Sequence, residues 1–286
     1  MSRIAYVNGQ YVPHRQAAVH IEDRGYQFAD GVYEVCEVRC GRMIDERRHM
    51  ERLDRSLREL RMAMPMPLKA LGTVLRETIR RNRVRDGFVY LQVTRGVAPR
   101  DHYFPAPGTP ASIVVTARAV DPAKGDALAR QGIAVITVPE NRWDRVDIKT
   151  VGLLPNVLAK QAAKEAGARE AWFIDADGHV TEGGSTNAWI VTTDGKLVTR
   201  PAESGILRGI TRTVMLDVAE KLQIRVEERS FTVAEALAAR EAFVTSATNF
   251  AMPVVRINGQ VVGDGLPGPV TRALRENFHQ HAEIAD

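Results

Sequence analysis

A lysine within an apolar segment is the first residue with an evident chemical use. Lys149 lies in the stretch 146–151, where Ile148 and two valines surround it. The chain has 39 basic residues, of which only seven are lysines: Lys69, Lys124, Lys149, Lys160, Lys164, Lys196 and Lys221. Lysine can lose its proton and act as a nucleophile or base, whereas arginine in practice cannot. The β-branched residues predict a short strand with Asp147 and Lys149 on one face. Alone, this pattern is more typical of an edge or solvent-facing lysine.

A single carboxylate follows at a glycine turn between two predicted strands. Glu182 precedes Gly183 and Gly184, and the hydroxyls of Ser185 and Thr186 come directly after them. Glycine allows the backbone to approach a ligand closely. A surface turn that happens to carry one acid is the alternative.

Two stretches have the composition of an anion site. Gly209, Ile210 and Thr211 stand at the start of a predicted helix, where free backbone N–H groups and the helix dipole favour a phosphate. Thr248 lies in a run of hydroxyl residues after a predicted strand, which suits a second anion contact. An ordinary helix cap and a serine/threonine turn explain the two patterns equally well.

The loop at 95–104 carries a pair of cationic side chains. Arg100 and His102 are alternate residues, so in an extended segment they project to the same side. Arginine can grip a carboxylate with two hydrogen bonds, and histidine can add a third donor. A solvated loop is the alternative. Tyr33, in a strand predicted over 32–38, is by itself more typical of a core residue.

Together these residues match the requirements of pyridoxal 5′-phosphate, which needs an amine, an acid for its ring nitrogen and anion sites for its phosphate. The order of the motifs resembles the fold-type IV pyridoxal-phosphate enzymes, which include branched-chain aminotransferases, D-amino-acid aminotransferases and aminodeoxychorismate lyase. The matching stretches are VDIK at 146–149, NVLAKQ at 156–161, VTEG at 180–183 and ILRGITR at 206–212. DRGYQFADGVYE at 23–34 and VTRGVAPRDH at 93–102 resemble the D-amino-acid aminotransferase branch, and the branched-chain enzymes do not share its Arg-x-His loop.

The resemblance implies a role for each candidate residue. Lys149 is expected to hold the cofactor as a Schiff base and to move the substrate proton, while Glu182 pairs with the pyridine nitrogen. The residues expected to bind the phosphate are Arg52, Ile210, Thr211 and Thr248. The residues expected to bind the substrate α-carboxylate are Tyr33, Arg100 and His102. In the family the Arg-x-His loop comes from the partner subunit, which implies a homodimer.

The reaction implied is ping-pong transamination between a D-amino acid and a 2-oxo acid, for example D-alanine and 2-oxoglutarate to pyruvate and D-glutamate. The alternatives within the fold are a branched-chain L-amino-acid aminotransferase and aminodeoxychorismate lyase. Two positions depart from the family pattern: Gly184 interrupts a run of hydroxyls, and Ala247 stands where a hydroxyl is common. Either change is expected to loosen the cofactor or to alter contacts with its ring.

These residues need a mixed α/β framework. We expect two domains, with the cofactor site between them: residues 1–120 as an N-terminal α/β domain, and 121–286 as a cofactor-binding domain with a mixed-sheet or barrel-like core. Apolar residues at helical spacing predict helices over 45–62 and 68–81. A helix is also expected over 156–166, a turn at 23–26 and a linker at 121–126, which is polar and contains Pro and Gly.

The composition is that of an ordinary globular protein. The net charge is +4, and the basic residues between 45 and 59 alternate with acids, which argues against a nucleic-acid binder. Cys36 and Cys40 are too few for a disulfide framework and lack a metal-binding spacing, so they are expected to be free thiols in a reducing cytosol. The first six residues hold no apolar signal core, and no run reaches the ~18 apolar residues of a membrane helix. We therefore expect a cytoplasmic protein without nucleic-acid, membrane or metal partners.

Overall fold

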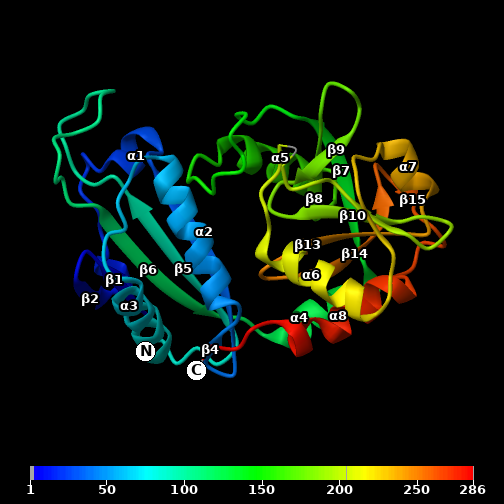
Figure 1. Cartoon of the computed structure of the whole chain (residues 1–286), viewed down its shortest axis with the longest axis horizontal. Helices are drawn as coiled ribbons and strands as arrows, with labels where there is room; N and C mark the ends of the chain where they lie inside the picture. Colours follow the sequence, from blue (N-terminus) through cyan, green and yellow to red (C-terminus); the bar gives the residue numbers. More distant parts are fainter. Residues whose placement is uncertain (1–2, 204, 286) are drawn as a thin grey trace. The chain divides into compact units, whose positions relative to one another are not determined.

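The computed structural model describes residues 3–203 and 205–285, which form two compact units (Figure 1). Met1 and Ser2, which begin the stretch inspected for a targeting signal, lie outside the described residues. The first unit runs to residue 122 and also contains residues 148–152 and those from 283 onward. The second unit comprises residues 123–147 and 153–282. Both units combine helices with sheets, which confirms the mixed α/β class.

The first unit is built on an antiparallel six-stranded sheet with the order β2-β1-β6-β5-β3-β4. Its strands are β1 (Ile4–Val7), β2 (Gln10–Pro13), β3 (Gly31–Arg39), β4 (Arg42–Met43), β5 (Gly87–Thr94) and β6 (Ser112–Ala119). The helices α2 (Glu46–Glu59) and α3 (Leu68–Arg81) cover one face of this sheet, as Figure 1 shows. The helices predicted over 45–62 and 68–81 are therefore confirmed.

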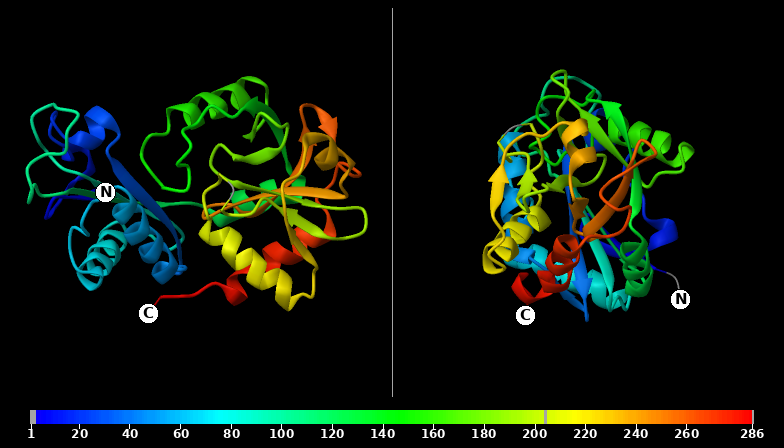
Figure 2. Two further views of the ribbon diagram at one scale, coloured as in Figure 1. Left: turned by 45° about the horizontal axis from the view of Figure 1, so that its top comes forward. Right: turned by 90° about the vertical axis from the view of Figure 1, so that its right-hand side faces the viewer.

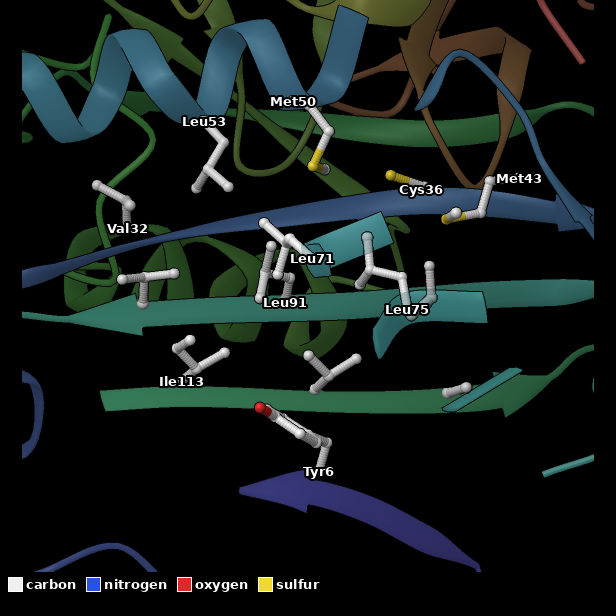
Figure 3. Packing of buried hydrophobic residues seen from close by; sticks show 14 of the residues in the cluster. Tyr6, Val32, Cys36, Met43, Met50, Leu53, Leu71, Leu75, Leu91 and Ile113 are labelled. Atoms are coloured by element: carbon white, nitrogen blue, oxygen red, sulfur yellow. The ribbon is translucent and has the colours of Figure 1, made fainter. Parts of the chain in front are cut away.

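The core of the first unit lies between this sheet and the two helices (Figure 3). Along β3 the residues Val32, Cys36 and Val38 are buried and face the helices. Because side chains alternate along a strand, Tyr33 is on the opposite face while Glu34 points into the helix-covered layer. The alternation of side chains along β3 therefore places Glu34, and not Tyr33, against α2.

Two short predictions in this region were wrong. Residues 23–26 were expected to form a turn, but α1 (Arg24–Phe28) begins there because the side chain of Asp23 caps it, accepting the N–H of Gly25 at 2.8 Å. Residues 121–126 were expected to form a linker; the two units do divide between residues 122 and 123, but α4 (Pro122–Gln131) makes residues 122–126 helical. Proline is favourable in the first turn of a helix because its missing N–H would have no partner there.

The second unit holds a mixed nine-stranded sheet with the order β12-β11-β10-β13-β14-β7-β8-β9, and β15 pairs with β14. Its strands are β7 (Ile133–Pro139), β8 (Glu170–Ile174), β9 (Val180–Gly183), β10 (Asn187–Val191), β11 (Leu197–Thr199), β12 (Val226–Glu228), β13 (Glu241–Ser246), β14 (Phe250–Ile257) and β15 (Gln260–Val261). The terminal strand β9 also packs against β10, so the sheet curls back on itself (Figure 2).

Helices surround this curled sheet. They are α4, α5 (Leu154–Glu165), α6 (Ile210–Lys221), α7 (Val233–Ala238) and α8 (Pro269–His281). The pair α6 and α8 lie against each other, and both contact β13; they appear in yellow and red in Figure 2. None of the helices within residues 3–203 and 205–285 combines the length and apolar character needed to cross a membrane.

The strand predicted around Lys149 was wrong. Residues 144–147 form a turn, and only Thr150 makes an isolated antiparallel bridge, with Val32 of β3. The backbone N–H of Tyr33 donates to the carbonyl oxygen of Lys149 at 3.0 Å. Ile148 is buried in the core of the first unit. This burial anchors residues 148–152 to the first unit, although they follow the boundary expected at 120/121.

Candidate active site

Lys149 lies against an aromatic pair in the first unit. Its Nζ is 4.2 Å from the centroid of the Tyr33 ring, within the range of a cation–π contact. The Tyr33 ring stacks on that of Tyr90 with the centroids 5.7 Å apart, and Tyr90 donates its hydroxyl to Gln92 Oε1 at 2.7 Å. Burial raises the pKa of Tyr90 to about 12, and the nearby Tyr33 adds to the effect. Tyr33 thus has a fixed position beside the predicted catalytic amine.

Arg52 forms a buried ion pair with Glu34. Arg52 Nε and Nη2 donate to the two carboxylate oxygens of Glu34 at 2.8 and 2.7 Å, and His49 Nδ1 lies 2.7 Å from Glu34 Oε2. Burial alone would raise the pKa of Glu34, but the charge and hydrogen bonds of Arg52 and the contact with His49 outweigh it and lower that pKa to about 2. The guanidinium of Arg52 is therefore fixed in orientation by an ionised carboxylate.

Arg100 and His102 share one aromatic neighbour. Arg100 Cζ is 5.1 Å from the centroid of the Phe28 ring, and the His102 ring is 5.5 Å from the same ring. Both side chains belong to an exposed loop of the first unit. The structure therefore brings these two side chains together, in keeping with the sequence pattern.

Glu182 is a buried carboxylate of the second unit. It lies on β9 and is 5% exposed. Arg142 Nη1 binds Glu182 Oε1, while Asn187 Nδ2 and the backbone N–H of Leu207 donate to Oε2 at 3.1 and 3.2 Å. Three donors and one full positive charge favour the ionised form of a buried carboxyl group. Glu182 is thus held as an oriented anion.

Arg142 joins Glu182 to a second carboxylate. Arg142 Nε and Nη2 donate to Glu140 at 2.8 and 2.6 Å, and Thr181 donates its hydroxyl to Glu140 at 2.7 Å. Burial would lower the pKa of Arg142, but its bonds with Glu140 and Glu182 raise it; burial would raise the pKa of Glu140, but Arg142 and Thr181 lower it. The group forms a carboxylate–guanidinium–carboxylate row.

The start of α6 lies next to Glu182. Ile210 and Thr211 are the first residues of the helix, both are buried, and no side chain among the described residues caps this end. Asn187 connects the two features, because its Nδ2 contacts Glu182 and also donates to the Leu207 carbonyl at 2.9 Å. A Cβ atom at Gly209 would come within 2.1 Å of Asn187 Oδ1. A side chain at this position would displace the Asn187 amide group that contacts Glu182.

Thr248 is exposed in the turn between β13 and β14. Its Oγ1 is 3.4 Å from Ser246 Oγ. Strand β13 pairs with β10 so that Thr245 stands opposite Asn187. The hydroxyl-rich turn therefore follows the same end of the sheet from which Asn187 contacts Glu182.

The two departures from the family pattern lie near this end of the sheet. A Cβ atom at Gly184 would be 3.0 Å from Lys160 Cδ and 3.1 Å from Glu170 Oε1. The adjacent Ser185 and Thr186 donate their hydroxyls to Glu170 at 3.1 and 3.2 Å. The small residue at 184 leaves room for the contact between Lys160 and Glu170. Nothing in the structure explains Ala247.

The predicted site residues thus fall into two sets. Tyr33, Arg52, Arg100, His102 and Lys149 belong to the first unit, whereas Glu182, Ile210, Thr211 and Thr248 belong to the second. The sequence interpretation did not identify the supporting residues, namely Glu34, His49, Glu140, Arg142 and Asn187. For Arg142 a local signal existed: opposite charges alternate at Glu140 and Arg142, just before the Lys149 segment.

The motifs and the fold agree with a known family. A sequence profile of the amino-transferase class IV family matches residues 31–257, so the chain belongs to this family. It is an aminotransferase, and pyridoxal 5′-phosphate is the cofactor of the class, as expected from Lys149 and Glu182.

Relatives with curated names refine the comparison. The chain is 40% identical over 279 residues to the D-alanine aminotransferase of Staphylococcus haemolyticus, with 97% of each chain covered. It is 42% identical over 268 residues to that of Bacillus licheniformis, covering 94% of this chain and 93% of the relative.

Solved structures show the same fold. The branched-chain amino acid aminotransferase of Escherichia coli matches with a TM-score of 0.91 at 26% identity, covering 98% of this chain and 94% of the other. The branched-chain aminotransferase of Thermoproteus uzoniensis, solved with norvaline, matches with a TM-score of 0.87 at 26% identity and covers 99% of each chain. The fold-type IV assignment is therefore confirmed.

Proposed function

We propose that this enzyme transfers the amino group between a D-amino acid and a 2-oxo acid, as in D-alanine and 2-oxoglutarate to pyruvate and D-glutamate. The observation that carries the proposal is the pairing of Arg100 with His102 around Phe28. Two adjacent cationic donors suit the α-carboxylate of a small amino acid. The similarity to curated D-alanine aminotransferases supports this choice over the branched-chain reaction and over aminodeoxychorismate lyase.

The residues present suit pyridoxal 5′-phosphate. Lys149 supplies an amine, Glu182 an oriented buried anion, and the start of α6 a set of backbone N–H groups without a side-chain cap. When bound, the cofactor withdraws electrons from the substrate α-carbon and so weakens its C–H bond. Lys149 Nζ would bind the cofactor, would be released when the substrate amine takes its place, and as a free amine would then accept the proton from that carbon. Tyr33, held by its stacking on Tyr90, would keep Nζ in place and contact the substrate carboxylate.

Glu182 would pair with the pyridine nitrogen and keep it protonated. For this role it must remain an anion, and its bonds with Arg142, Asn187 and the Leu207 N–H meet that need. Arg142 is therefore the residue that sets the charge state and direction of Glu182. Glu140 in turn holds Arg142 from its other side.

Four residues would bind the cofactor phosphate. Arg52 would offer charged N–H donors, Ile210 and Thr211 backbone amides and a hydroxyl, and Thr248 a further hydroxyl. A guanidinium has five N–H donors in a rigid plane, so pairing with Glu34 is compatible with a second anionic partner. Hydrogen bonds to charged groups contribute roughly 1.5–3 kcal/mol each, so several of them would hold the phosphate during turnover.

We further propose a homodimer in which the loop at 95–104 completes the partner subunit's site. Aromatic side chains on this loop and on α1 are exposed in the single chain: Tyr103 by 82%, Tyr26 by 75% and Phe104 by 57%. Monomeric proteins rarely expose large apolar patches, so these residues suit an interface. We also propose a cytoplasmic location, in keeping with the two unpaired cysteines.

The experiment that tests the reaction is a product analysis with the purified protein. D-alanine and 2-oxoglutarate should yield pyruvate and D-glutamate in equal amounts. Parallel reactions contain L-leucine with 2-oxoglutarate, or aminodeoxychorismate alone. Formation of L-glutamate from L-leucine as the main activity, or release of pyruvate from aminodeoxychorismate, would overturn the proposal in favour of a related enzyme.

A further inference from the structure

A buried arginine fixes the loop that carries Arg100 and His102. Arg24, on α1, is 4% exposed. Its Nε donates to Asp30 Oδ2 at 2.9 Å, and its Nη1 donates to the carbonyl oxygen of Asp101 at 2.7 Å. Asp101 stands between Arg100 and His102 in the sequence. Arg24 therefore fixes the backbone between Arg100 and His102, the two residues predicted to bind the substrate carboxylate.

Arg24 also contacts the Phe28 ring, which is the aromatic neighbour of both Arg100 and His102. Arg24 Cζ is 4.8 Å from the centroid of the Phe28 ring, to which Arg100 Cζ is 5.1 Å and the His102 ring 5.5 Å away. The side chains of Arg100 and His102 are otherwise on an exposed loop without regular structure. Their common position depends on this ring and on the backbone beneath them.

Asp30 anchors Arg24 and extends the network to the beginning of the loop. Arg95 Nε also donates to Asp30 Oδ2, at 2.7 Å, and Arg95 Nη2 donates to the Leu60 carbonyl at 2.8 Å. Arg95 Cζ lies 3.9 Å from the centroid of the Phe104 ring. Burial would raise the pKa of Asp30, but the hydrogen bonds and charges of Arg95 and Arg24 lower it. The loop is thus held at both ends and in its middle.

We propose that Arg24, anchored by Asp30, is a positioning residue that presents Arg100 and His102 to the α-carboxylate of the substrate. This inference rests on the proposed function, because it takes Arg100 and His102 as the carboxylate ligands. Burying a guanidinium is costly, so a buried arginine that holds a loop backbone indicates a need for a defined loop conformation. A loop that is already ordered loses less conformational entropy when the substrate binds.

The test compares Arg24→Lys and Arg24→Met with the wild-type holoenzyme. Lysine keeps the charge but lacks the planar group that reaches both Asp30 and the Asp101 carbonyl. Arg118→Met is the matched control. Arg118, on β6 of the same unit, also lies over a phenylalanine ring, that of Phe88. If the methionine variant does not fold, the lysine variant carries the test.

Three measurements separate positioning from a general structural role. Hydrogen exchange of peptides from residues 97–105 should become faster in Arg24→Lys while exchange in β5 is unchanged. The KM for D-alanine should rise about tenfold or more with kcat changed by less than about twofold. The spectral change produced by ethylamine, an amine without a carboxylate, should be the same as in the wild type. Arg118→Met should alter none of the three.

The outcomes also separate this inference from the proposed function. Unchanged exchange of the loop in Arg24→Lys, or an equal loss of reactivity towards ethylamine and D-alanine, would overturn the positioning role. Arg100→Met tests the site itself and should raise the KM for D-alanine by at least as much. An unchanged KM in Arg100→Met would contradict the carboxylate assignment, whatever Arg24→Lys does to the loop.

Discussion

Two buried ion pairs, one in each unit, use the same chemistry in opposite ways. In the first unit Arg52 is the predicted cofactor ligand, and Glu34 holds it with two hydrogen bonds. In the second unit Glu182 is the predicted ligand, and Arg142 holds it. The ligand is a cation where a phosphate is expected and an anion where a pyridinium is expected. In both places a partner of opposite charge fixes the ligand's direction.

The charge of a residue alone therefore does not show whether the residue binds the cofactor or supports another residue that does. Each pair contains one residue that would touch the cofactor and one that supports it, and only the intended ligand decides which is which. Breaking a buried pair by removing one partner typically costs about 3–5 kcal/mol, since it leaves the other charge without compensation. Mutations of the supporting residues should therefore affect stability and cofactor binding together, in proportions that differ between the two pairs.

The largest effect is expected at the amine proposed to bind the cofactor. Lys149→Ala should reduce transamination by at least about a thousandfold and abolish the absorbance band of the Schiff base, because the covalent link is lost. Lys221→Ala, at the end of α6, is the control and should behave as wild type. A persistent Schiff-base band in Lys149→Ala would mean that another lysine binds the cofactor.

The second pair should control the rate more than cofactor binding. Glu182→Gln keeps the shape but removes the charge, and kcat should fall by roughly a hundredfold to a thousandfold while the cofactor stays bound. Arg142→Met should lower kcat less and should also destabilise the fold, because it leaves Glu182 and Glu140 buried without their shared cation. Steady-state kinetics and urea unfolding measure the two effects. A wild-type kcat in Glu182→Gln would contradict the role of this pair.

The first pair should control cofactor affinity more than the rate. Glu34→Gln removes the partner of Arg52, and we expect about tenfold weaker cofactor binding with a nearly normal kcat at saturating cofactor. Glu37→Gln is the control, since it lies on the same strand but on the opposite face of the sheet. Titration of the apoenzyme with pyridoxal 5′-phosphate gives the affinities. Equal effects from the two variants would show that the pair with Arg52 has no special role.

The smallest effect is a pH dependence of stability. The pKa of Glu34 is about 2, below its usual 4.5, because its charged form is paired with Arg52 and His49. The stabilisation is therefore fully present above pH 4.5 and is lost as the pH falls from 4.5 towards 2, by on the order of 3 kcal/mol. Urea unfolding at about pH 5.5 and about pH 3.5 should show a larger loss for the wild type than for Glu34→Gln. An identical loss would contradict the assignment to Glu34.

The sequence predicted the elements whose signals are local. Apolar residues at helical spacing placed α3 at residues 68–81, as the structure has it. Local propensity failed at Lys149, where the β-branched neighbours indicated a strand. There the burial of Ile148 in the first unit and the bridge to Val32 decide the backbone. The same tertiary contacts place this segment with the first unit although it follows the expected boundary.

The proposed ligands of the site have local sequence signals that the residues supporting them lack. Lys149, Glu182 and the pair Arg100 and His102 have types and neighbours that indicate chemistry. Arg142 and Glu182 are forty positions apart. Such a pair forms only after the sheet has closed, so the local alternation of Glu140 and Arg142 does not indicate Glu182 as a partner. The contacts of Arg24 and Asp30 were not predicted either, because α1, which carries Arg24, was predicted as a turn.

We propose that Lys149 and Glu182 serve a transaminase specific for D-amino acids. The most direct measurement is the visible spectrum of the purified holoenzyme after addition of D-alanine or L-alanine, without a 2-oxo acid. We expect D-alanine to convert the visible band of the bound cofactor to that of the pyridoxamine phosphate form, with release of one pyruvate per site. L-alanine should leave the band unchanged. Conversion by L-alanine alone, or no visible band at all, would contradict the proposal.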